Sequence, residues 1–236
     1  MATEILADKT AITHRALEIV LELYQGAIAA RGLFTLVAAG GSTPKSLYQA
    51  LALQSLDWPK VHVFWGDERY VPVTDPQSNQ GMTRTAWLDR VPIPTTNIHP
   101  IPTEDPDPAI AAASYEQKIK AFFAPGEPVF DLILLGIGDD GHTASLFPYT
   151  DALAVGDRLV TVGRKDNQPR ITFTYPLINQ ARQILFLVDG AAKAPAIAAI
   201  LGADLEVDIQ KYPAQGVSSA ATWLLSQEAA AMLQQP

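Results

Sequence analysis

The sequence predicts an α/β fold in which a largely parallel β-sheet carries helices on both faces. Four short apolar runs have the length and composition of buried strands: 33–39, 61–65, 131–137 and 184–188. Segments with helical spacing of apolar residues alternate with these runs. Because parallel strands need crossover connections, usually helices, the alternation indicates a Rossmann-like sheet. No shift in composition marks a boundary, so we expect one domain over residues 1–236.

The first half of the chain opens with the clearest helical pattern, in which apolar residues recur at 12, 16, 19 and 23. The elements predicted there are a helix over 10–30, a strand over 33–39, a helix capped by Thr43 with Pro44 at its first position, a strand over 61–65 and a helix over 81–90. Breakers at Pro72, Asp75 and Pro76 predict a long ordered loop over 66–79. Residues 91–108 are rich in proline and are predicted to be irregular.

The second half continues the alternation of helices and strands. The elements predicted there are a helix over 109–123, a strand over 131–137, a glycine-rich loop with a short helix after it, strands over 158–162, 170–174 and 184–188, a helix over 191–201, a strand over 221–224 and a final helix capped by Ser226.

Composition excludes several classes of protein. The chain has no cysteine, so it can form neither a disulfide framework nor a thiolate metal site. Its net charge of −8 argues against a nucleic-acid surface, and no apolar run approaches the ~20 residues of a membrane helix. The first residues include Glu4 and Asp8 and do not form a secretory signal. We therefore expect a cytoplasmic protein, a monomer or small homo-oligomer, without nucleic-acid or membrane partners.

The most informative segment is the run from Gly136 to Pro148, which follows the apolar strand predicted at 131–137. Ligands of open α/β sheets bind where strands end, and this strand ends in glycines, acids and His142. A histidine there can accept a proton near neutral pH, and Asp140 is placed to orient its ring. The alternative for Asp140 is a turn residue before Gly141. The other three histidines lie in helical, strand or proline-rich contexts.

A second glycine-containing segment joins the strand at 33–39 to the next helix. Gly40 and Gly41 leave backbone N–H groups free at a helix N-terminus, and Ser42 and Thr43 add two hydroxyls. This combination suits a phosphate group. The alternative is an ordinary tight turn with a threonine cap.

Charged residues follow the strand at 61–65. Asp67, Glu68 and Arg69 form either a solvated turn or part of a site, and flanking aromatic residues at 65 and 70 favour partial enclosure. Arg170 and Lys193 are two further cations, and their ordinary interpretation is as surface charges. Lys193 lies near a predicted helix N-terminus, where a bound anion would relieve its repulsion from the helix dipole. Asn79 is a candidate cap for the following helix.

Five blocks of sequence carry a resemblance to a known family. They are Ala39–Pro44, Trp65–Pro72, Asp75–Asn79, the run 136–148 and Pro169–Thr172. In this order they resemble the 6-phosphogluconolactonases, in the superfamily that also holds the glucosamine-6-phosphate deaminases. The resemblance implies that Gly40, Gly41, Ser42 and Thr43 bind phosphate, that Asp67 is a polar or proton-handling residue, and that Arg69, Arg170 and Lys193 face the substrate.

The implied activity is hydrolysis of 6-phospho-D-glucono-1,5-lactone to 6-phospho-D-gluconate in the oxidative pentose phosphate pathway, with no metal and no cofactor. His142 would be the general base for water attack, and Asp67 and Asp140 would assist it. One alternative is an aminosugar-phosphate isomerase or deaminase, but Phe147 stands where those enzymes carry a glutamate. Another is a non-catalytic phosphosugar sensor, although no DNA-binding extension is visible. A Gly-x-Ser-x-Gly motif is absent, which disfavours a serine hydrolase.

Overall fold

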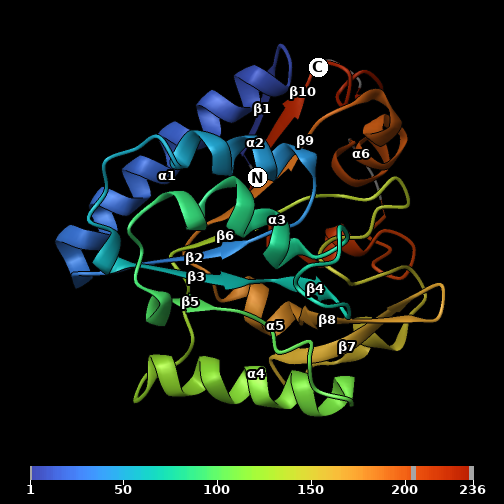
Figure 1. Ribbon diagram of the computed structural model, residues 1–236. Helices are drawn as coiled ribbons and strands as arrows, with labels where there is room; N and C mark the ends of the chain where they lie inside the picture. Colours follow the sequence, from blue (N-terminus) through green and yellow to red (C-terminus); the bar gives the residue numbers. More distant parts are fainter. Residues whose placement is uncertain (1, 203–205, 234–236) are drawn as a thin grey trace.

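The computed structural model describes residues 2–202 and 206–233 and confirms the α/β fold with a parallel sheet (Figure 1). Seven strands pair in the order β1-β10-β9-β6-β2-β3-β5, and every pair is parallel. Their bounds are β1 Ala2–Leu6, β2 Phe34–Ala38, β3 Val61–Trp65, β5 Ile98–His99, β6 Leu132–Leu135, β9 Ile184–Val188 and β10 Thr222–Ser226. The edge strands β1 and β5 were not predicted, because neither forms a continuous apolar run.

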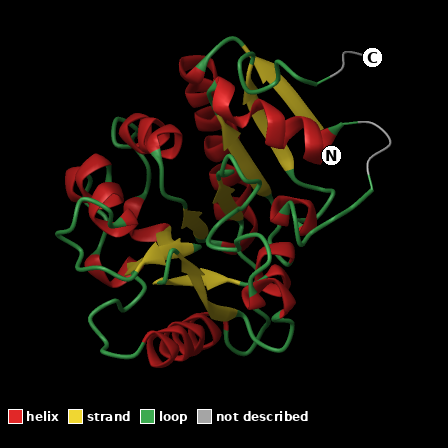
Figure 2. Ribbon diagram, turned by 90° about the vertical axis from the view of Figure 1, so that its right-hand side faces the viewer, coloured by secondary structure: helices red, strands yellow, loops and turns green. Residues whose placement is uncertain are grey.

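Helices lie on both sides of this sheet (Figure 2). The α-helices are α1 Lys9–Arg31, α2 Ser42–Leu51, α3 Asn79–Ala86, α4 Pro108–Phe123, α5 Tyr175–Asn179 and α6 Ala194–Leu201. Short 3-10 helices cover Trp58–Lys60, Leu88–Arg90, Thr95–Asn97, Asp151–Ala154, Ala191–Lys193 and Pro213–Gly216. In the described part of the chain, no helix combines the length and apolar character required to cross a membrane.

A second, antiparallel sheet was not predicted. It has the order β4-β8-β7, with β4 Asp67–Arg69, β7 Val160–Lys165 and β8 Gln168–Phe173. The start of the loop predicted over 66–79 is therefore a strand. The strands predicted at 158–162 and 170–174 exist, but they pair with each other outside the parallel sheet. Helix α4 packs along one side of this second sheet (Figure 1).

Several predicted caps and helices are wrong. Helix α2 begins at Ser42 with Gly41 as its cap, so Thr43 is its second residue and Pro44 its third. Ser78, not Asn79, caps α3, with its hydroxyl accepting from the Gly81 N–H at 3.0 Å. The short helix predicted after the glycine-rich loop is the 3-10 helix Asp151–Ala154, and turns with a Thr143–Leu146 bridge precede it. After Ser226 the chain forms turns through residue 233, and the rest of the predicted final helix lies outside the described residues.

A buried carboxylate connects the beginnings of the two central strands. Asp131, directly before β6, accepts hydrogen bonds from the Thr35 backbone N–H at 2.9 Å and from the Thr35 hydroxyl at 3.0 Å. Arg31, at the end of α1, donates to the other carboxylate oxygen at 2.5 Å, and Arg182 approaches it at 3.4 Å. The Asp131 side chain is only 4% exposed, so its charge depends on these partners.

We predict that Asp131→Ala lowers the free energy of unfolding by about 3 kcal/mol, because it removes four contacts and leaves a buried N–H of β2 without an acceptor. Urea denaturation measures the change. The control is Asp157→Ala, which removes a fully exposed pairing with Arg158 and should leave the denaturation midpoint unchanged. Equal midpoints for all three proteins would show that Asp131 does not anchor the strands.

Candidate active site

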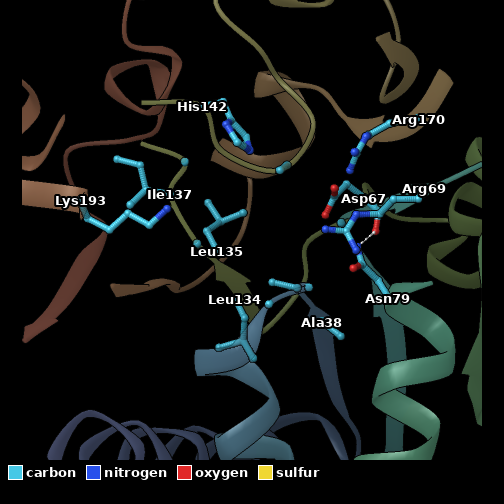
Figure 3. A pocket seen from close by; sticks show the side chains of 17 residues that line it. Ala38, Asp67, Arg69, Asn79, Leu134, Leu135, Ile137, His142, Arg170 and Lys193 are labelled. Atoms are coloured by element: carbon cyan, nitrogen blue, oxygen red, sulfur yellow. Dashed lines mark hydrogen bonds between the residues drawn. The ribbon is translucent and has the colours of Figure 1, made fainter. Parts of the chain in front are cut away.

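A cavity of about 270 Å³ opens where the central strands of the parallel sheet end. Residues 38–41 at the end of β2, residues 66–67 after β3 and residues 134–138 at the end of β6 line it. His142, Arg170 and Lys193 complete its wall, and Figure 3 shows Lys193 across the cavity from the pair Asp67 and Arg69. The structure therefore brings together the strand ends that the sequence identified as site elements. Of the four histidines, His142 alone lines the cavity.

His142 and Asp140 form a hydrogen-bonded pair. The ring Nδ1 lies 2.5 Å from Asp140 Oδ1, which also accepts from the His142 backbone N–H at 3.1 Å. A carboxylate can only accept, so Nδ1 carries a hydrogen and the neutral ring keeps its lone pair on Nε2. The hydrogen bond from His142 lowers the pKa of Asp140 to about 2. The alternative of Asp140 as a simple turn residue does not account for this contact with the ring.

Glycine is required where the loop carrying this pair closes on itself. A Cβ at Gly138 would overlap the His142 ring and lie 2.5 Å from the Asp140 carboxylate. The Gly138 N–H donates to the His142 carbonyl at 2.8 Å, and the Gly141 N–H donates to the Gly138 carbonyl at 3.0 Å. Gly141 adopts a φ of 81°, which glycine accepts without strain. These contacts fix the imidazole relative to the end of β6.

Asp67 lines the cavity and is 8% exposed. Its Oδ2 accepts a hydrogen bond from the Ser145 hydroxyl at 2.7 Å, which orients the carboxylate. The Asn79 amide donates to the Asp67 carbonyl at 3.0 Å, and Asn79 also lines the cavity (Figure 3). Sequence reasoning missed Ser145 and gave Asn79 only a capping role. The signal for Asn79 was its place in the Asp75–Asn79 block.

Glu68 does not line the cavity and has a structural role. It is 2% exposed, and its carboxylate accepts from the backbone N–H groups of Asn79 and Gln80, both at 2.7 Å, and from the Ser78 hydroxyl at 3.1 Å. Burial raises its pKa above the ordinary value, while these donors favour the charged form. The carboxylate thus stabilises the N-terminus of α3 and holds Asn79 beside the cavity.

Arg69 and Arg170 lie side by side on adjacent strands. They are directly opposite each other in the β4–β8 pairing, and the Nε of each is buried without a hydrogen-bond partner in the described residues. Burial lowers the pKa of Arg170, and the neighbouring Arg69 charge lowers it further. Two like charges facing each other across strands are destabilising. A bound anion would relieve this repulsion and satisfy the free donors.

Of the remaining predicted site residues, Lys193, Gly40 and Gly41 line the cavity, and Ser42 and Thr43 lie outside it. Lys193, directly before α6, forms an ion pair with Asp139, a contact that the sequence did not indicate. Ser42 is exposed and Thr43 is 8% exposed, in the first turn of α2. The α2 N-terminus still presents N–H groups that lack intrahelical acceptors.

No group of three or more histidine, aspartate or glutamate side chains within the described ranges is arranged to hold a metal ion. The chemistry that the residues present can perform is proton transfer at His142 and stabilisation of negative charge by the surrounding cations.

The depressed pKa of Asp140 leads to a prediction about pH. Carboxyl ¹³C NMR should show Asp140 titrating near 2, and in His142→Ala its pKa should rise toward 3.8, because the hydrogen bond from the ring is the main cause of the shift. The stabilisation linked to this shift is complete above about pH 4 and is lost as the pH falls through about 2. A pKa near 3.8 for Asp140 in the wild-type protein would contradict the hydrogen bond between Asp140 and His142.

The chain is similar to known proteins over nearly its whole length. Residues 7–225 match the family model "Glucosamine-6-phosphate isomerases/6-phosphogluconolactonase". The chain is 53% identical to a 6-phosphogluconolactonase of Nostoc (98% of this chain, 97% of the other) and 55% identical to one of Synechocystis (96% and 95%). A solved 6-phosphogluconolactonase of Trypanosoma brucei superimposes with a TM-score of 0.86 at 28% identity, covering 99% of this chain and 98% of the other. The chain therefore belongs to the glucosamine-6-phosphate isomerase/6-phosphogluconolactonase family.

Proposed function

We propose that this protein hydrolyses 6-phospho-D-glucono-1,5-lactone to 6-phospho-D-gluconate, as the second step of the oxidative pentose phosphate pathway. The observation that carries the proposal is the Asp140–His142 pair, whose imidazole enters a cavity that Arg69, Arg170 and Lys193 also line. A lactone is an activated ester that water can open, so a general base and anion-binding groups are sufficient catalysts. The names of the relatives support this substrate.

In the proposed mechanism, His142 Nε2 removes a proton from a water molecule as that water attacks the lactone carbonyl carbon. The carbonyl oxygen becomes an oxyanion, and cations or backbone N–H groups stabilise it. The intermediate then collapses, the bond from the carbonyl carbon to the ring oxygen breaks, and the imidazolium returns its proton to that oxygen. Asp140 stabilises the imidazolium and keeps Nε2 directed at the water. Asp67 is proposed to contact the substrate or handle a proton from the opposite wall.

The phosphate is proposed to bind through the Gly40–Gly41 segment and the N-terminus of α2, including the backbone of Ser42 and Thr43, together with one or more of the cavity cations. A contact made equally in the ground and transition states lowers KM, whereas an oxyanion contact raises kcat. Kinetics of single-cation variants will therefore assign Arg69, Arg170 and Lys193 to phosphate or to oxyanion.

Deaminase chemistry is disfavoured by Phe147. This side chain is 5% exposed and lies beside the His142 ring, with 4.4 Å between ring centroids, and phenylalanine cannot transfer protons. We further propose that the partner is the small phosphorylated lactone alone and that the enzyme works in the cytoplasm as a monomer or small homo-oligomer. The absence of cysteine is compatible with a reducing compartment.

The decisive test compares the phosphorylated lactone with unphosphorylated gluconolactone, each corrected for its spontaneous hydrolysis. We expect kcat/KM to be at least about 10²-fold higher for the phosphorylated lactone, because the anion site holds the carbonyl in place for attack. Ammonia release from glucosamine 6-phosphate is measured in parallel and should be absent. Equal kcat/KM for the two lactones would overturn the phosphosugar assignment.

A glycine substitution tests the role of the Asp140–His142 pair. Gly138→Ala should lower kcat by about 10²-fold or more, because the added methyl group overlaps the imidazole and displaces the general base. The control is Gly156→Ala, since a Cβ at Gly156 meets nothing within 4 Å. Circular dichroism checks that both variants are folded. If Gly138→Ala folds and keeps the wild-type kcat, catalysis does not depend on the position of the His142 ring.

A further inference from the structure

The charged residues of the antiparallel sheet share one face. Side chains directly opposite each other in paired antiparallel strands lie on the same face, and side chains two apart along a strand do as well. Arg69 pairs with Arg170, and Arg170 pairs with Gly163 of β7. Lys165, two residues after Gly163, therefore lies on the face that carries the two arginines. Its neighbour Arg164 lies on the opposite face.

This face packs against the loop that carries His142. The Ser145 N–H donates to the Thr172 hydroxyl of β8 at 3.1 Å, and a Cβ at Gly163 would overlap the Ser145 carbonyl oxygen. The close approach brings the end of β7 over Phe147. Lys165 Nζ lies 5.4 Å from the centroid of the Phe147 ring, which in turn contacts His142.

Arg170 approaches the same ring, with its guanidinium carbon 5.7 Å from the centroid. Phe147 thus lies beside the imidazole with Lys165 and Arg170 around it. The influence of Lys165 reaches Asp140, whose pKa is lowered mainly by the His142 hydrogen bond and to a smaller extent by the Lys165 charge.

Lys165 is exposed, and the described residues offer its ammonium neither a carboxylate within ion-pairing distance nor a hydrogen-bond acceptor. Its position is set by a two-residue turn in which Asp166 and Asn167 have φ values of 49° and 63°. This turn, with Lys165 paired to Gln168, is typical of a tight hairpin, and aspartate and asparagine tolerate its left-handed backbone. The hairpin therefore holds an uncompensated cation beside the site in a protein of net charge −8.

We propose that Lys165 is a further substrate-binding residue: it does not itself line the cavity, but its flexible side chain brings the ammonium to the phosphate of the bound lactone beside Arg170, which does. This inference rests on the proposed function. A lysine at the tip of a hairpin adds a flexible donor to the arginines at the base of the same sheet. Its contact is made in ground and transition states alike, so it determines KM and selectivity for the phosphorylated substrate and leaves kcat unchanged.

The test compares Lys165→Met, Lys165→Arg and the control Arg164→Met, each with both lactones. Methionine keeps an unbranched apolar stem over Phe147 and removes the charge. For the phosphorylated lactone, Lys165→Met should raise KM about three- to tenfold with kcat within about twofold of wild type. Lys165→Arg should retain most of the affinity. Arg164→Met, which removes the same charge from the other face, should keep wild-type KM, and gluconolactone kinetics should be the same for all four proteins.

Each other outcome has a distinct meaning. If wild-type enzyme hydrolyses the phosphorylated lactone and Lys165→Met has the same KM, the inference is overturned and the proposed function stands. If Lys165→Met lowers kcat equally with both lactones, the lysine acts through Phe147 and His142, and the inference is also overturned. If the wild type does not exceed the blank, the proposed function fails. In that case, calorimetry measures the affinity of wild type and of Lys165→Met for 6-phosphogluconate. Equal affinities would show that Lys165 does not contact the phosphate and would overturn the inference.

Discussion

The active site depends on the contact that Ser145 makes between the two sheets. Ser145 is completely buried, its hydroxyl donates to Asp67 Oδ2, and its backbone N–H donates to Thr172. Through this residue the loop that follows β6 of the parallel sheet lies against the polar face of the antiparallel sheet. The hydrogen-bonded pair Asp140 and His142 comes from the loop after β6, and the two arginines come from the antiparallel sheet. Neither sheet alone would place an imidazole opposite a guanidinium pair across a cavity.

The same arrangement is electrostatically unfavourable where the two arginines meet. Facing guanidiniums on β4 and β8 repel each other, and burial withdraws the water that would screen them. The nearby negative charges of Asp67 and Glu68 partly offset this repulsion, because both favour the charged form of Arg170. The Nε of each arginine is buried without an acceptor among the described residues, so an anion in the cavity would be offered two free donors. An acidic protein can in this way bind a phosphorylated substrate with a few cations concentrated in one place.

The elements that could be predicted from the sequence are those whose burial leaves a local pattern of apolar residues. The central strands β2, β3, β6 and β9 are buried on both faces, so each is a continuous apolar run that can be read directly. Strand β4 is three charged residues, and only its pairing with β8, a hundred residues later, makes it a strand. The loop of His142 was recognisable because glycines follow an apolar strand. The contacts of Ser145 and Lys165 are tertiary and had no local signal, whereas Asn79 was marked only by its place in the Asp75–Asn79 block.

The family name covers two chemistries, isomerisation and lactone hydrolysis, on one fold. The parallel sheet and the glycine segments form the floor of the cavity, which opens at the ends of the central strands. The loop after β6 adds His142 and, beside it, Phe147. Phe147 places an apolar ring against the imidazole, and Asp140 holds the same imidazole through Nδ1. An isolated base beside a cation pair suits the activation of water at an ester, whereas opening a sugar ring would need a further proton relay where the phenylalanine stands.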